Sequence, residues 1–299
     1  MNADTDSFHK AVLPPIAATI ASLREQVQKA RQAGRTIGFV PTMGALHDGH
    51  ASLIEAAKSA RTFCVVSIYV NPTQFAPNED LAAYPRTMDA DRAKCGRAGA
   101  ELIFAPADSE MYPLGEQTRV KPGILADRMC GLFRPGHFEG VCTVVAKLLN
   151  IVQPDIAFFG QKDAQQALII QKMVDDLRIP VLIQVCPIVR EADGLAMSSR
   201  NAYLSPEERR QALCLNHALT LGRDRLLAGE KDMQSITSSM RDEICRVVHF
   251  HGGTVSIDYV EINDAVTLVP RDAPFGRMLL AGAVRIGKTR LIDNMIVDV

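Results

Sequence analysis

The first two thirds of the chain alternate between short apolar runs and amphipathic stretches, and this alternation limits the possible folds more than any other feature. Residues 63–70 form a continuous apolar run rich in β-branched side chains, as expected for a strand that is covered on both faces. In residues 140–153, by contrast, apolar side chains recur at helical spacing. Strands that alternate with helices predict an α/β fold with a doubly wound, mostly parallel, Rossmann-like sheet.

The same pattern assigns the elements along the chain. The expected strands are residues 36–40, 63–70, 101–104, 155–159 and 180–188, and the expected helices begin near residue 50 and cover 88–100, 140–153 and 164–177. After residue 189 the order changes to two helical stretches and then short strands, at 206–228, 232–249, 256–261, 278–281 and 289–293. We therefore expect two domains: residues 1–189 with the parallel sheet, and residues 190–299 as a smaller C-terminal α+β lid domain.

The composition argues against several classes of protein. The 299 residues include 33 Lys and Arg against 34 Asp and Glu, so the net charge of −1 gives no general attraction to nucleic acid or to an anionic membrane. No apolar run approaches the length of a membrane span, and the first fifteen residues hold no apolar core of a secretion signal. The seven cysteines are scattered without a CxxC pair, which favours reduced thiols in a cytoplasmic protein.

The segment Pro41–His50 carries the strongest chemical signal. It joins an expected strand to an expected helix, and His47 and His50 lie three residues apart at the helix start, so both rings share one face. Free N–H groups and the positive end of the helix dipole suit a phosphate there, and small Gly44 and Ala45 allow close approach of a nucleotide. We interpret the segment as an ATP site without a P-loop lysine; a metal-binding histidine pair or two surface histidines are the alternatives.

Two further loops offer polar side chains for a small substrate. Asn71 and Gln74 directly follow a buried strand, and their neutral amides suit a ligand with hydroxyl groups. Arg134 suits a phosphate or a carboxylate, and His137 is expected one turn ahead of the next helix. For each loop taken alone, an ordinary turn or surface loop is the competing interpretation.

Two more segments offer groups for a nucleotide. At an expected strand-to-helix junction, Lys162 suits a phosphate, Asp163 suits ribose hydroxyls, and Gln166 lies one turn further along. Asp163 as a helix cap is the alternative. Just past the expected domain boundary, Ser198–Arg200 offers two hydroxyls and an arginine that can fold over a triphosphate, although any polar loop has this composition.

These segments together resemble the pantothenate synthetase (pantoate–β-alanine ligase) family, within the nucleotidyltransferase superfamily that is named for its HIGH motif. Residues 41–50 match the family's variant of that motif, and the other segments follow in the family's order: Asn71–Phe75, Tyr84–Arg86, Arg134–Gly140, Gly160–Gln166, Met197–Asn201 and Lys288–Asn294. The resemblance covers the chain from about residue 16. It implies ATP-dependent condensation of pantoate with β-alanine to pantothenate through a pantoyl adenylate, with release of AMP and pyrophosphate.

The resemblance also implies roles for individual residues. The catalytic groups would be His50, as the family's proton donor, together with His47, Lys162 and Arg200. The ATP-binding set would be Met43, Gly44, Ala45, Leu46, His47, Asp48, Gly49, His50, Gly160, Gln161, Lys162, Asp163, Val189, Met197, Ser198, Ser199 and Arg200. The substrates pantoate and β-alanine would be bound by Gln74, Gln166 and Asn71, with Arg134 and His137 in support. Mg²⁺ would enter on the ATP phosphates, and Asp89 or Asp91 would contact it at most through water.

Two positions depart from the family pattern: Gln161 replaces the Glu of many members, and Ala202 replaces a Gly, which would stiffen the adjoining loop. The first fifteen residues are an extension without an apparent role. The family is typically dimeric, so we expect a homodimer. The alternative functions are another HIGH-motif enzyme, which Gln74 and Gln166 disfavour because they suit a small hydroxy acid, and a nucleotide-binding protein without catalysis, which the intact reacting groups disfavour.

Overall fold

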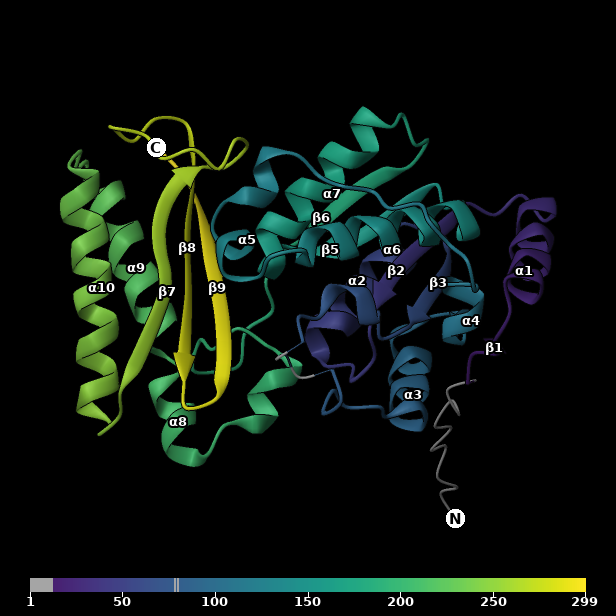
Figure 1. Ribbon diagram of the computed structural model, residues 1–299, viewed down its shortest axis with the longest axis horizontal. Coiled ribbons are helices and arrows are strands. Elements are labelled where there is room, and N and C mark those ends of the chain that lie inside the picture. The colour runs from purple at the N-terminus through teal and green to yellow at the C-terminus, as the bar shows by residue number, and fades with distance from the viewer. Residues whose placement is uncertain (1–12, 78, 80) are drawn as a thin grey trace, which may run out of the picture.

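Two separate sheets organise the molecule (Figure 1). The computed structural model describes residues 13–77, 79 and 81–299, so most of the N-terminal extension lies outside the described residues. A six-stranded parallel sheet has the order β1-β4-β3-β2-β5-β6, and a three-stranded antiparallel sheet has the order β7-β8-β9. The predicted fold class, a parallel α/β sheet followed by a smaller α+β part, is confirmed.

The first sheet and its helices occupy residues 16–186. Its strands are β1 (Ile16–Ala17), β2 (Ile37–Thr42), β3 (Phe63–Ile68), β4 (Leu102–Phe104), β5 (Ile156–Gly160) and β6 (Leu182–Cys186). Its helices are α1 (Ile20–Gln32), α2 (Asp48–Ser59), α3 (Met88–Ala98), α4 (Asp108–Met111), α5 (Cys130–Phe133), α6 (His137–Val152) and α7 (Ala164–Asp176). Short 3₁₀ turns are η1 (Pro72–Gln74), η2 (Ile124–Asp127) and η3 (Gln161–Asp163).

The second sheet belongs to residues 199–298. This part contains η4 (Ser199–Tyr203), α8 (Pro206–Gln211), α9 (Cys214–Leu227), α10 (Met233–Phe250), β7 (Val255–Asp264), β8 (Arg277–Ile286) and β9 (Thr289–Asp298). Helices α9 and α10 pack on the sheet, as Figure 1 shows at the left. Residues Ile236, Met240 and Ile244 of α10, spaced one helical turn apart, are fully buried against it.

The parallel sheet is covered on both faces because successive strand residues point to opposite sides. Phe39 of β2 packs on the side of α1, α6 and α7, whereas its neighbour Val40 packs on the side of α2 and α3. Both side chains are fully buried, and burial of each stabilises the fold by about 1.5–3 kcal/mol. The continuous apolar runs in the sequence are therefore explained by two-sided burial.

The position of the site follows from one reversal in strand order. From β2 the chain runs outward through β3 and β4, and it then returns so that β5 pairs with the opposite edge of β2. The loops after β2 and β5 therefore leave the sheet side by side at a topological switch point, where open α/β sheets bind ligands. Those loops contain residues 43–50 and 160–166.

Several element boundaries differ from the prediction. The helix expected over 206–228 is two helices, α8 and α9, and buried Ala212 and Cys214 pack into the C-terminal core where they meet. The C-terminal strands are longer than expected, because β8 and β9 remain paired from Arg277↔Asp298 to Ile286↔Thr289 through half-polar residues that carry little apolar signal. Strand β1 and helix α1 were not predicted.

Candidate active site

Two adjoining cavities of about 240 and 1070 Å³ lie at the switch point and extend toward the C-terminal sheet. The smaller cavity is lined by the loops after β2 and β5, and the larger one by the loop after β5 and by residues of β8 and β9. Residues shared by both linings are Arg134, His137, Lys162, Asp163, Gln166, Ser198 and Arg200. Most of the predicted site residues thus surround one continuous space.

His47 and His50 cap the start of α2 and line the smaller cavity. Nδ1 of His47 accepts a hydrogen bond from the amide of Gly49 at 3.1 Å, and Nδ1 of His50 accepts one from the amide of His47 at 3.2 Å. A neutral imidazole has one donor and one acceptor nitrogen. Because the backbone uses Nδ1 of both rings as the acceptor, Nε2 of each carries the proton and is left as a donor.

The surroundings keep this histidine pair neutral. Burial, reinforced by the positive charge of Lys162, lowers the pKa of His47 to about 4. Burial and the adjacent His47 hold the pKa of His50 well below its ordinary value. The ring centroids are 4.0 Å apart, so two protonated rings would repel each other strongly. At neutral pH the site therefore presents two uncharged N–H donors.

The turn before His47, which was expected to lie close to the nucleotide, has its amides engaged within the protein. The amide of Gly44 donates to the Thr42 hydroxyl at 3.3 Å, and those of Ala45 and Leu46 donate to the Asp91 carboxylate at 3.0 and 2.7 Å. These three N–H groups already have partners within the protein. The contacts with Asp91 were not predicted, because contacts from distant residues have no signal in the local sequence.

Asp89 and Asp91 were the candidate magnesium contacts. Neither residue lines either cavity. Asp91 is only 2% exposed and both of its carboxylate oxygens accept backbone N–H groups, whereas Asp89 is exposed in the same turn of α3. Within the described part of the chain, no group of three or more His, Cys, Asp or Glu side chains is arranged to hold a metal ion.

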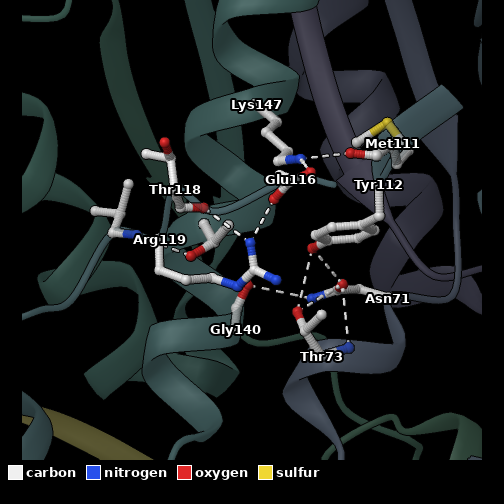
Figure 2. A network of polar contacts seen from close by, with 11 residues as sticks. Asn71, Thr73, Met111, Tyr112, Glu116, Thr118, Arg119, Gly140 and Lys147 are labelled. Atoms are coloured by element: carbon white, nitrogen blue, oxygen red, sulfur yellow. Dashed lines mark hydrogen bonds and ion pairs between the residues drawn. The ribbon is translucent and has the colours of Figure 1, made fainter. Parts of the chain in front are cut away.

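Asn71, predicted as a substrate contact, lines the smaller cavity and is held by hydrogen bonds within the protein. It is 1% exposed, and its Oδ1 accepts hydrogen bonds from the hydroxyls of Tyr112 at 2.7 Å and Thr73 at 3.0 Å (Figure 2). Its Nδ2 donates to Oε1 of Gln74 at 3.1 Å and to the Gly140 carbonyl at 3.2 Å. With both amide atoms engaged, Asn71 orients Gln74 so that the Gln74 amide nitrogen, which contacts Met43 Sδ at 3.1 Å, faces away from Asn71.

Tyr112 was not identified from the sequence, yet it anchors this network. Lys147 lies over its ring, with Nζ 4.2 Å from the centroid, and also forms an ion pair with Glu116 (Figure 2). Tyr112 lies 41 residues from Asn71 in a loop without a recognisable motif. Only the packing of α6 against that loop brings the residues together.

Arg134 and His137 support Gln74 from the opposite side. Arg134 makes two 2.6 Å hydrogen bonds with Glu79 and donates to Nε2 of His137 at 2.9 Å. His137 then donates from Nδ1 to the carbonyl of Gln74 at 2.9 Å. It is the first residue of α6, so the helix begins one turn earlier than expected. Burial and the nearby guanidinium of Arg134 lower the pKa of His137 to about 4.

The loop after β5 is fixed from the C-terminal sheet. The side-chain nitrogen of Asn294 of β9 donates to the backbone carbonyls of Gln161 and Lys162 at 3.0 and 2.9 Å. Its side-chain oxygen accepts a hydrogen bond from Nε2 of Gln161 at 3.2 Å. Asp163 is exposed and makes no side-chain cap of α7, so the capping alternative is not realised. Lys162 and Asp163 line both cavities.

The segment after β6 folds back over the smaller cavity. The Met197 amide donates to the carbonyl of Val189 at 3.0 Å, which brings the two ends of this loop together. Ser198 then caps η4 by accepting from the Arg200 amide at 3.3 Å. Val189 and all residues of Met197–Arg200 line this cavity.

The structure brings most of the predicted site residues together. Those that line at least one of the two cavities are Met43, His47, Gly49, His50, Asn71, Gln74, Arg134, His137, Gly160, Lys162, Asp163, Gln166, Val189, Met197, Ser198, Ser199 and Arg200. Five predicted ATP-binding residues do not line them: Gly44, Ala45, Leu46, Asp48 and Gln161. Glu79 and Tyr112 were missed because only tertiary contacts bring them to the site. Asp91 and Asn294 were named from the sequence, but their contacts with the loops after β2 and β5 were not predicted.

A parallel α/β sheet whose switch point carries paired histidine donors and Lys162 around one cavity has the architecture of a nucleotide-binding α/β protein. The chain also matches the model of the pantoate-beta-alanine ligase family over residues 15–296, and it belongs to that family. It is 54% identical to the pantothenate synthetase of Moorella thermoacetica over 94% of this chain and 98% of that protein.

Solved structures agree with this assignment. A pantothenate synthetase structure from Thermus thermophilus is 43% identical, covers 94% of this chain and 98% of that one, and has a TM-score of 0.87. The pantoate-beta-alanine ligase of Francisella tularensis, complexed with Beta-gamma ATP and Beta-alanine, is 34% identical, with a TM-score of 0.77 over 95% of this chain and 97% of that one. No described helix of this chain is long and apolar enough to span a membrane.

Proposed function

We propose that this chain activates pantoate with ATP and transfers the pantoyl group from the adenylate to β-alanine, which yields pantothenate, AMP and pyrophosphate. Family membership supports ATP-dependent formation of pantothenate. One observation carries the mechanism: two neutral histidine donors, a fixed glutamine amide and Lys162 line the same small cavity. Such a cavity suits a compact hydroxy acid beside a triphosphate.

The first step turns an unreactive carboxylate into a good acyl donor. A carboxylate oxygen of pantoate attacks the α-phosphorus of ATP, and the bond from that phosphorus to the bridging oxygen breaks as pyrophosphate leaves. We assign charge stabilisation to the Nε2–H groups of His47 and His50 and to Lys162, together with Ser198–Arg200. Catalysis here is alignment and charge stabilisation, which preorganised donors supply without rearrangement.

For His50 the environment favours hydrogen-bond donation over proton transfer. Its low pKa makes it neutral throughout the physiological range, and a neutral ring donates Nε2–H to a phosphate oxygen without giving up the proton. This role differs from the proton donor that the family resemblance implied. Both roles require the same tautomer.

Gln74 and Gln166 are the proposed pantoate-binding residues. Asn71 fixes the amide of Gln74 from one side, and His137 holds the Gln74 backbone from the other. We therefore assign Asn71, His137 and Arg134 supporting roles. In the second step the unprotonated amine of β-alanine attacks the acyl carbon of the adenylate. The bond from that carbon to the bridging oxygen breaks, AMP leaves with that oxygen, and the nitrogen releases one proton to solvent as the amide forms.

The proposed adenosine-binding residues are Gly160, Asp163 and Val189, with Met197 beside them. Mg²⁺ is proposed to arrive on the phosphates of ATP and to neutralise part of their charge when bound, since the described acidic side chains form no cluster of their own. We also propose a homodimer, as implied by the family, and a cytoplasmic location, which the free, mostly buried cysteines support.

The proposal is tested by omitting one substrate at a time. Purified protein with Mg²⁺, ATP, pantoate and β-alanine should form pantothenate and AMP in equal amounts, measured by mass spectrometry. Omission of pantoate, or its replacement by tyrosine or a nucleotidyl acceptor, should abolish AMP formation. Formation of AMP with those substitutes would instead favour another HIGH-motif enzyme.

A non-catalytic nucleotide-binding protein is the remaining alternative, and a lysine variant tests it. Lys162→Met should lower the rate by at least about a hundredfold, because it removes a charge from the developing transition state. If Lys162→Met matches the wild-type rate, the activity comes from a contaminant or from another site.

A further inference from the structure

We propose that Asp91 is the positioning residue of the ATP loop: its buried carboxylate binds the turn that precedes His47 and holds both histidines in their working geometry. This inference rests on the proposed function for the identity of the nucleotide. It replaces the expectation that Asp91 contacts magnesium.

The carboxylate of Asp91 is engaged by two consecutive backbone amides. Oδ2 accepts from Ala45 at 3.0 Å and Oδ1 accepts from Leu46 at 2.7 Å, although Asp91 lies more than forty residues further along the chain. The side chain is 2% exposed. A buried carboxylate that accepts two N–H groups is strongly favoured in that position, because charge-assisted hydrogen bonds are about twice as strong as neutral ones.

The backbone conformation of the turn explains why its amides need an anionic partner. Gly44 has a φ of 85° and Ala45 a φ of 50°, and these left-handed residues turn the amides of Ala45 and Leu46 toward one anion. Left-handed backbone costs a non-glycine residue roughly 1–2 kcal/mol. A concave pair of amides of this kind commonly binds phosphate; here a carboxylate of the protein occupies it.

A side chain at position 44 would be crowded by its neighbours and strained by the left-handed backbone. A Cβ on Gly44 would lie 3.1 Å from Oδ2 of Asp91 and 3.1 Å from a methyl group of Ile68. The turn is therefore held between β3 and α3. His47 follows directly, and its amide binds Nδ1 of His50, so a shift of the turn would move both rings.

A second contact from α3 reaches the same helix start. Lys94, one turn beyond Asp91, forms a 2.6 Å ion pair with Asp48, the first residue of α2. The Asp48 side chain is 66% exposed, so this pair contributes little. The buried carboxylate of Asp91 is therefore the main link between α3 and the histidine motif.

The decisive experiment compares two variants of one helical turn. Asp91→Asn preserves shape but places an NH₂ group against a backbone N–H. Asp89→Asn is the matched control, because it removes the same charge from an exposed side chain in the same turn. We expect Asp91→Asn to raise KM for ATP and to lower kcat by about tenfold each, with KM for β-alanine changed by less than about twofold. Asp89→Asn should leave all three constants near the wild-type values.

Two results would overturn the inference. Equal behaviour of the two variants would show that the contact with the turn is dispensable. A higher Mg²⁺ requirement in Asp91→Asn, with KM for ATP unchanged at saturating Mg²⁺, would identify a metal contact instead. Calorimetric binding of ATP without the other substrates separates this test from the proposed function, because loss of binding in Asp91→Asn counts even if no pantothenate forms.

The wild-type protein provides a test that does not depend on folding of a variant. Hydrogen exchange should show the amides of Ala45 and Leu46 protected without ATP, with little further protection when ATP and Mg²⁺ are added. Fast exchange that slows only on addition of ATP would show that these amides wait for a phosphate, and the inference would fail.

Discussion

At the scale of single residues, hydrogen bonds fix the tautomers of three histidines in one cleft. Two of them carry the ring proton on Nε2, and the third carries it on Nδ1. His47 and His50 accept amide protons at Nδ1, whereas His137 donates from Nδ1 to a carbonyl and accepts from Arg134 at Nε2. The first two thereby present Nε2–H donors at the smaller cavity. His137 thereby binds the carbonyl of Gln74. A proton added at its Nε2 would be repelled by the guanidinium of Arg134.

The stability of the protein should fall steeply with mild acid because of these histidines. His47 and His137 have pKa values of about 4 in the folded state and about 6.5 when unfolded, so below pH 6.5 the unfolded chain binds more protons. Each should remove about 1.4 kcal/mol of unfolding free energy per pH unit between pH 6 and 5. Urea unfolding at pH 7, 6 and 5 measures this slope.

A variant of one buried histidine checks the source of that slope. His137→Asn should reduce the slope by the share of one histidine. A flat stability profile between pH 7 and 5 would contradict the buried neutral state.

The orientation of the Gln74 amide should depend on Asn71. Asn71→Asp would remove the donor to Oε1 of Gln74 and add an acceptor, so the Gln74 amide should reverse. We expect KM for pantoate to rise about tenfold, with KM for ATP nearly unchanged. Thr73→Val, which removes a different hydrogen bond to Asn71, should have a much smaller effect on steady-state kinetics. Equal effects on both Michaelis constants would indicate a general disturbance instead.

The sequence predicts a site residue when its role follows from neighbouring residues in the chain, and fails when the role depends on contacts with distant segments. The histidine pair, Gln74 and Lys162 stand in short motifs at strand ends, so their place was predictable. The engagement of the Ala45 amide by Asp91 was not, because it requires contact between segments that are far apart in the chain. The hydrogen bonds of Asn71 to Gln74, Tyr112 and the Gly140 carbonyl were not predictable for the same reason.

At the scale of elements, the pairing of β5 with β2 assembles the cleft. The alternation of strands and helices predicted the strands, but not their order, since order depends on which edges meet after folding. That pairing places Gly38 beside Ile156 and so brings the loops after β2 and β5 to one edge. Strand β9 adds a contact from the C-terminal sheet through Asn294.

Removal of that contact should loosen the loop around Lys162. Asn294→Ala would leave the Gln161 and Lys162 carbonyls without their donor, and we expect KM for ATP to rise about fivefold to tenfold. Asn263→Ala, at an equally buried asparagine of β7, should lower the thermal midpoint but leave KM for ATP unchanged. Kinetics and thermal unfolding of both variants test this, and an unchanged KM in Asn294→Ala would contradict it.

At the scale of the whole molecule, the two sheets act on one cleft. We propose the division near residue 189 as the domain boundary. Just after it, Arg190 binds Asp293 of β9 with two hydrogen bonds of 2.7 and 2.9 Å. This contact ties the loop after β6 to strand β9 of the C-terminal sheet. Loops of both parts line the larger cavity.

The central claim is that this cleft forms an adenylate of pantoate before β-alanine takes part. The most direct measurement is exchange of labelled pyrophosphate into ATP, with protein, Mg²⁺ and pantoate present and β-alanine omitted. The account predicts exchange that requires pantoate and is lost in Lys162→Met. Absence of exchange under conditions in which pantothenate forms with β-alanine would contradict a separate adenylation step.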